Sequence, residues 1–73
     1  MSKIPLTRKQ QDILAMIKKY KQDNNFAPTI EYLARAFSIS GSTMYEHLLA
    51  LETKGWIRKY KFYERSIEVI NGD

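Results

Sequence analysis

His47 is the only histidine of this sequence, and the sequence pattern places no nucleophile and orienting carboxylate beside it that would form a catalytic group. Nucleophilic catalysis needs a serine or cysteine beside a base and a carboxylate that orients the base. His47 instead falls on the spacing of an apolar helical stripe, which favours a structural role in the core or facing phosphate. The absence of cysteine excludes disulfides and thiolate metal sites. We therefore predict no catalytic residue, no metal site and no cofactor, and expect a protein that is not an enzyme.

Positive charge is concentrated toward the end of the chain. The formal net charge is +4 over 73 residues, and the segment from Lys54 to Arg65 holds five basic residues and one acid. This segment alone therefore accounts for the whole net positive charge of the chain. A basic surface attracts polyanions such as nucleic acid or acidic lipid, although many small proteins are basic for no specific reason. The position of the charge is thus more informative than its sum.

The elements that would position this charge begin with helices, which the hydrophobic spacing predicts at about residues 7–23, 29–37 and 41–54. Thr7 with Gln10 three residues later is a capping box, and Thr29 after Pro28 can cap the second helix. Either Ser40 or Gly41 opens the third. Gly55 is well placed to end it.

The pattern changes after Gly55. Residues 56–60 and 65–70 are rich in aromatic and β-branched types, and they predict a hairpin over about 56–70 with its turn at 61–64. Trp56 is expected to pack beneath this hairpin rather than to stack on a base. The fold class is therefore α+β, mostly α: one domain over 1–73, a three-helix winged helix-turn-helix with a C-terminal β-hairpin wing. In such a domain the second helix of the pair enters the major groove and the hairpin faces phosphates.

Five stretches of the sequence resemble the DNA-binding domain of LexA repressors. They are Leu6 to Leu14, Ala27-Pro28-Thr29, Ser42-Thr43-Met44 with His47-Leu48, Leu51 to Gly55, and Arg65 to Val69. The stretches between Ser42 and Gly55 are shared by many winged-helix regulators, whereas the opening Leu6-Thr7, Pro28-Thr29 and the closing Arg65 to Ile67 are more specific to the family. The resemblance implies a DNA-binding transcription regulator, a repressor, of bacterial or phage origin. LexA repressors continue into a self-cleaving, dimerising domain that this sequence does not contain, so it is either a short relative or an excised domain.

Carried over by position, the resemblance assigns two sets of DNA contacts. The recognition helix would meet bases through Ser40, Ser42, Thr43, Tyr45 and Glu46. The wing would meet the phosphate backbone through Arg58, Lys59, Lys61 and Arg65. A carboxylate on a helix that faces DNA indicates specificity rather than affinity, because Glu46 can accept from a cytosine amino group but is repelled by phosphates.

The sequence departs from the family in three places. Tyr32 stands where a Glu normally completes the capping box of helix two, and Ser38 stands where the inter-helix turn normally has Gly. The wing tip carries three aromatic residues in place of small ones: Tyr60, Phe62 and Tyr63. Exposed aromatics often mark partner surfaces, so we expect this tip to contact a second copy on DNA or a partner protein. The alternative function is a winged-helix protein-interaction module that docks through this tip.

Several classes of protein are excluded by what the sequence lacks. It has no apolar run of about 18 residues that could span a membrane, and Met1 to Thr7 has no apolar stretch of a signal peptide. No small-molecule site is evident. We therefore expect double-stranded DNA as partner and a cytoplasmic location, associated with the nucleoid when DNA is bound. The operator, the regulated genes and the sign of regulation have no signature in these residues.

Overall fold

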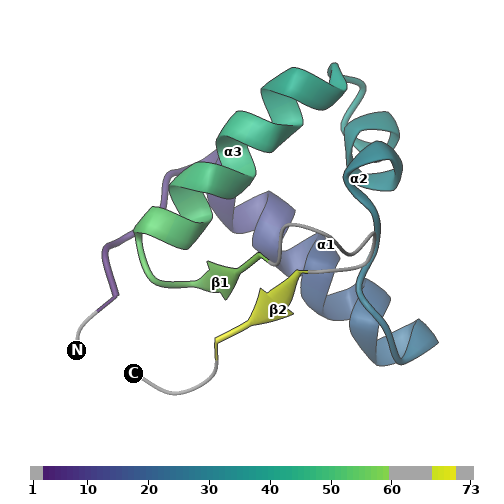
Figure 1. Cartoon of the computed structure of the whole chain (residues 1–73), viewed down its shortest axis with the longest axis horizontal. Helices are drawn as coiled ribbons and strands as arrows, with labels where there is room; N and C mark the ends of the chain where they lie inside the picture. The colour runs from purple at the N-terminus through teal and green to yellow at the C-terminus, as the bar shows by residue number, and fades with distance from the viewer. Residues whose placement is uncertain (1–2, 60–66, 71–73) are drawn as a thin grey trace.

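A computed structural model describes residues 3–59 and 67–70 of the chain. Three helices, α1 (Arg8–Asn24), α2 (Ile30–Ala36) and α3 (Gly41–Thr53), precede a pair of short antiparallel strands, β1 (Ile57–Arg58) and β2 (Glu68–Val69). In Figure 1, α3 runs across the top, α2 lies beside its start, and the strands lie below α3 with α1 behind them. This arrangement confirms the predicted winged helix-turn-helix. No described helix is long and apolar enough to cross a membrane.

The helix starts follow the capping signals of the sequence. The Thr7 hydroxyl accepts from the Gln10 amide at 3.2 Å, and the Gln10 side chain accepts from the Thr7 amide at 3.0 Å, which completes the capping box of α1. The Thr29 hydroxyl caps α2 by accepting from the amide of Tyr32. Tyr32 cannot return that bond as a glutamate would. Gln10 also accepts from the Lys54 ammonium at 2.7 Å, which ties the start of α1 to the end of α3.

The core lies between the helices and the base of the hairpin. Apolar side chains repeat at helical spacing on α1 and α3 and turn inward, so their other faces remain toward solvent. On β1, Ile57 is buried and its neighbour Arg58 is exposed, as strand alternation requires. Trp56 is partly buried against this core, so it covers the core edge rather than filling its centre. The buried apolar residues are Ile13, Leu14, Ile17, Ala27, Leu33, Ala34, Met44, Leu48, Leu51, Ile57 and Ile67.

Two helices end in the same hydrogen-bonded turn, once with glycine and once without. After α3, the backbone amide of Gly55 donates to the carbonyl of Glu52, and the amide of Trp56 donates to the carbonyl of Leu51, each at 3.0 Å. After α2, the backbone amide of Ser38 donates to the carbonyl of Arg35 at 3.1 Å, and the amide of Ile39 donates to the carbonyl of Ala34 at 3.0 Å. Both are Schellman motifs, whose first residue past the cap adopts a left-handed backbone. That residue has φ +92° at Gly55 and φ +57° at Ser38.

We therefore expect Ser38→Gly to stabilise the protein, although glycine normally destabilises. In the left-handed region, the backbone conformation of a residue with a Cβ is about 1 kcal/mol less favourable than that of glycine. In a domain of this size, each kcal/mol gained in the free energy of unfolding should raise the midpoint of thermal unfolding by roughly 4–8 °C, as followed by circular dichroism.

The matched control is Gly55→Ser, which should shift the midpoint downward. A Cβ at Gly55 would meet only Lys3 Cγ at 3.8 Å, an ordinary contact, so backbone conformation alone sets the sign there. A Ser38→Gly protein that unfolds at or below the parent temperature would contradict the account of this turn.

Candidate nucleic-acid interface

The five side chains predicted for the recognition helix are all exposed, one at the N-cap of α3 and four in its first two turns. Met44, Leu48 and Leu51 point into the core at positions i, i+4 and i+7. Of the residues between them, Tyr45, Glu46 and Leu49 are exposed. The exposed residues at the start of α3 and along its front include the whole predicted set: Ser40, Ser42, Thr43, Tyr45 and Glu46.

Ser40 has a structural task as well as an exposed position. Its hydroxyl oxygen accepts from the backbone amide of Thr43 at 3.1 Å, which caps α3. The same hydroxyl donates to the Thr43 hydroxyl at 2.9 Å, and it lies 3.2 Å from the hydroxyl of Ser42. The three hydroxyls thus form one small polar cluster at the positive end of the helix, a place that favours anions such as phosphate.

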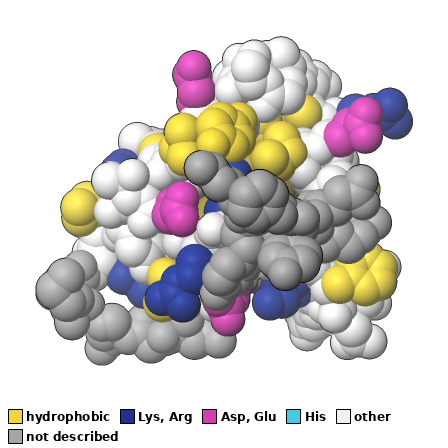
Figure 2. All heavy atoms as spheres, viewed as in Figure 1, with side chains coloured by type: hydrophobic (Ala, Val, Ile, Leu, Met, Phe, Trp, Pro, Cys, Tyr) yellow, Lys and Arg dark blue, Asp and Glu magenta, His cyan; other side chains and the backbone are white. Residues whose placement is uncertain are grey.

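The middle of α3 is apolar as well as exposed. Tyr45 and Leu49 are 42% and 39% exposed, and Figure 2 shows hydrophobic side chains gathered over α3 on the face in view. An apolar ring next to Glu46 can pack on a thymine methyl group, which adds shape recognition to hydrogen bonding.

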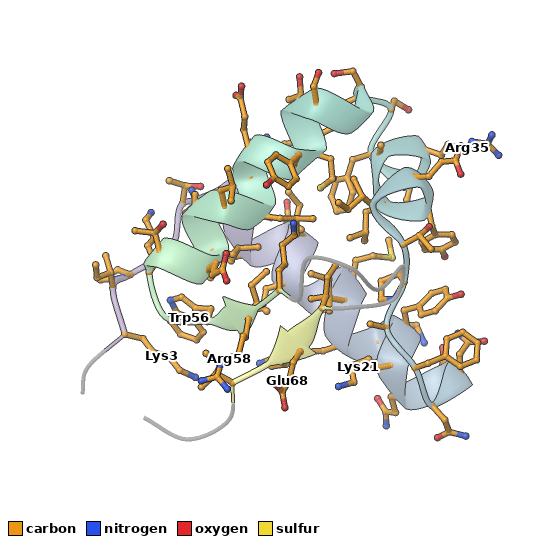
Figure 3. All side chains as sticks on the ribbon, viewed as in Figure 1. Lys3, Lys21, Arg35, Trp56, Arg58 and Glu68 are labelled. Atoms are coloured by element: carbon orange, nitrogen blue, oxygen red, sulfur yellow. The ribbon has the colours of Figure 1, made fainter. Side chains whose placement is uncertain are left out.

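Only part of the predicted wing set falls within the described residues. Arg58 is exposed on β1, with its guanidinium 3.9 Å from the carboxylate of Glu68 on the adjacent strand. Figure 3 shows both side chains projecting from the paired strands. Such an exposed pair is weak, so the guanidinium can exchange its carboxylate for a phosphate at small cost. The remaining predicted wing residues lie outside the described residues: Lys61 and Arg65, and the aromatic tip Tyr60, Phe62 and Tyr63.

Lys59 lies within the described residues, and it contacts α3 instead of projecting freely from the wing. Its ammonium lies 4.1 Å from the centroid of the Tyr45 ring, and its backbone amide donates to the Glu52 carboxylate at 3.3 Å. Lys59 and Tyr45 were predicted as separate DNA contacts, and Glu52 was not predicted as a functional residue. No local signal joins these three residues, because the contact depends on how the chain returns past α3.

The opposite end of the hairpin is held by the N-terminal arm. The Trp56 indole donates to the Ile4 carbonyl at 2.7 Å, and the Lys3 ammonium lies 4.5 Å from the indole centroid while donating to the Ile70 carbonyl. Figure 3 shows Lys3 beside Trp56. Trp56 also borders a shallow groove of about 410 Å³ against α1. These contacts anchor the base of the wing.

Titratable side chains give no sign of a metal centre in the parts of the chain that the structure describes. Within residues 3–59 and 67–70, no three side chains of the His, Cys, Asp and Glu types gather closely enough to hold an ion. His47 is half-buried on α3, between the buried positions of Met44 and Leu48. What the site offers is therefore a polar helix front, a neighbouring cation and an exposed arginine.

Comparison with known proteins places this architecture in a family. The family model described as the LexA DNA binding domain matches residues 3–66. LexA repressors of Leptospira biflexa, Thermosipho melanesiensis and Bacillus thuringiensis are 38%, 38% and 39% identical to the chain over 68, 65 and 69 residues. These alignments cover 93%, 89% and 93% of the chain, but only 34%, 33% and 34% of the relatives.

A solved structure supports the same fold. A hypothetical protein from Sulfolobus solfataricus superposes with a TM-score of 0.76 at 27% identity, covering 90% of this chain and 48% of that one. The chain thus spans about a third of the length of the curated relatives it matches, and the match takes in the described helices and β1. This chain belongs to the LexA DNA-binding domain family.

Proposed function

We propose that residues 1–73 form one domain that binds double-stranded DNA at preferred sequences and acts as the DNA-binding part of a transcription repressor. The observation that carries this proposal is the front of α3, where all five predicted recognition residues are exposed on a helix held by its other face. The relatives that match nearly the whole chain are named as repressors. A cytoplasmic location fits this function and remains a prediction.

In this proposal α3 lies in the major groove, which is wide enough for one helix. The hydroxyl cluster of Ser40, Ser42 and Thr43 enters first and can bond to base edges or a phosphate. Glu46 accepts from the exocyclic amino group of cytosine, and Tyr45 packs beside it. Arg58 then reaches the phosphate backbone from the base of the wing.

One domain of this size covers few base pairs, so we propose that two copies bind neighbouring half-sites spaced by about one helical turn, roughly 10 base pairs. Whether the copies touch through Tyr60, Phe62 and Tyr63 remains a prediction, because these residues lie outside the described ones. The same holds for the alternative in which that aromatic tip docks a partner protein. Binding to duplex DNA that weakens steeply with salt separates the two, since only the DNA reader requires it.

The direct test is an unbiased selection of duplex oligonucleotides by the purified chain, followed by titration of the selected and scrambled duplexes at several salt concentrations. A DNA reader should enrich one recurrent sequence and prefer it over scrambled duplex by a factor of roughly 10³ or more. Enrichment of no sequence, with affinity for all duplexes equal, would reject sequence-specific regulation.

Arg58→Met should weaken binding to every duplex alike. The substitution removes one exposed charge, so the slope of log affinity against log salt should fall by about 1. Fluorescence anisotropy with the selected and the scrambled duplex measures both effects.

Glu68→Gln provides the matched control, because it removes the carboxylate that lies 3.9 Å from the Arg58 guanidinium. It should strengthen binding slightly and equally for both duplexes. Unchanged affinity and slope in the Arg58→Met protein would mean that this side of the wing does not approach DNA.

A further inference from the structure

The recognition helix and the start of the wing are joined by a single lysine. Tyr45 and Glu52 are seven residues apart on α3, so they share one face about 10 Å apart along the helix axis. Lys59 spans that interval: its backbone amide is held on the Glu52 carboxylate, and its ammonium lies over the Tyr45 ring. One residue therefore contacts the helix front at two points.

The contact of Lys59 with the Tyr45 ring differs from the other lysine–aromatic contacts in its location. The described residues include three lysines over aromatic rings, at Trp56, Phe37 and Tyr45. Trp56 belongs to the core edge and the arm, and Phe37 is the cap of α2. Tyr45 is the ring of this group that lies among the predicted base-reading residues, and its lysine lies closest to the ring centroid, at 4.1 Å.

We infer that Lys59 is a positioning residue for Tyr45 and thereby a determinant of base preference, rather than only a cation for phosphate. This inference rests on the proposed function. An ammonium over the face of a tyrosine is attracted by the negative charge of the ring face. Because the backbone of Lys59 is held at Glu52, that attraction restricts the rotamers of Tyr45, which is 42% exposed with Lys59 in place. A restricted ring meets the groove already ordered, which sharpens its choice among base pairs.

Arg58 offers an internal contrast. It is the neighbour of Lys59 on the chain and carries the same charge, but its guanidinium lies against Glu68 on the next strand. Removal of either charge should weaken binding to all duplexes through lost phosphate attraction. Removal of Lys59 should in addition change which sequences are preferred, because Tyr45 is released.

The contact itself is tested in the free protein by NMR. Ring currents should shift the Lys59 Cε protons upfield in the parent. The shift should persist in Tyr45→Phe, which keeps the ring, and should vanish in Tyr45→Leu. A Lys59 shift that is the same in Tyr45→Leu as in the parent overturns the inference without reference to DNA.

The consequence is tested by repeating the duplex selection with Lys59→Met, Tyr45→Leu, the double variant, Lys59→Arg and Arg58→Met. Lys59→Met and Tyr45→Leu should each reduce the preference at the same base position by roughly three- to tenfold, within the range of one base contact. The double variant should lose no more than Tyr45→Leu alone. Lys59→Arg, which retains a cation for the ring, and Arg58→Met should both keep the parental preference.

Each remaining outcome is decisive. A Lys59→Met protein that is weaker on all duplexes but keeps the parental base preference would make Lys59 a phosphate contact only and would overturn the inference. A parent that shows the NMR contact yet selects no DNA sequence would reject the proposed function, and the inference about specificity would fall with it while the contact stood.

Discussion

Leu48→Ala should leave much of the protein unfolded at 37 °C. Leu48 is 0% exposed in the middle of α3, within the core cluster that joins the helices to the hairpin. Burial losses and the remaining cavity make a leucine-to-alanine change in a core cost about 2–5 kcal/mol. Native domains have only about 0.05–0.15 kcal/mol of stability per residue, so this loss is a large part of the total for a chain this short.

Thermal unfolding followed by circular dichroism should show the midpoint of Leu48→Ala falling by roughly 10–30 °C. Leu49→Ala is the matched control, since it removes the same atoms one position along α3 from a side chain that is 39% exposed. Its effect should be several-fold smaller. Equal losses in the two variants would mean that α3 does not bury the face described for it.

Local signals in the sequence were sufficient to locate the helices. The capping box of Thr7 and Gln10 and the turn at Gly55 depend on residues within a few positions of each other, and both were confirmed. Ser38 was identified as a departure from the family, and its positive φ shows what glycine would supply there. The family itself was predicted from short motifs and confirmed by the model match over residues 3–66.

Contacts between distant parts of the chain could not be predicted in the same way. The pairing of Ile57 with Val69 and of Arg58 with Glu68 lies within the strands predicted over 56–60 and 65–70, but its register was not predicted. The pairing of Lys59 with Tyr45 crosses from the wing to α3, and the arm contact of Trp56 with Ile4 spans most of the chain. Such contacts depend on the angle at which elements pack, which hydrophobic periodicity does not encode.

The largest effect on DNA recognition is expected from Glu46, whose exposed carboxylate lies on the front of α3. A negative charge on this face opposes every phosphate, so its presence is useful only where it accepts a hydrogen bond from a base. Glu46→Ala should therefore change affinity in opposite directions for different duplexes. Binding to scrambled DNA should strengthen, because repulsion is removed. Preference for the selected site should fall by roughly 5- to 150-fold, equivalent to 1–3 kcal/mol for one base contact.

Anisotropy titrations of the parent and Glu46→Ala with selected and scrambled duplexes measure both changes, and a repeated selection identifies the base position that is no longer specified. Glu31→Ala is the control, because it removes an exposed carboxylate from α2 that lies 3.8 Å from the Arg35 guanidinium. It changes the net charge equally, so any general electrostatic gain should appear in both variants. Only Glu46→Ala should lose base preference. If both variants select the parental site with the same discrimination, Glu46 reads no base, and the carboxylate on α3 has only the repulsive effect that its charge predicts.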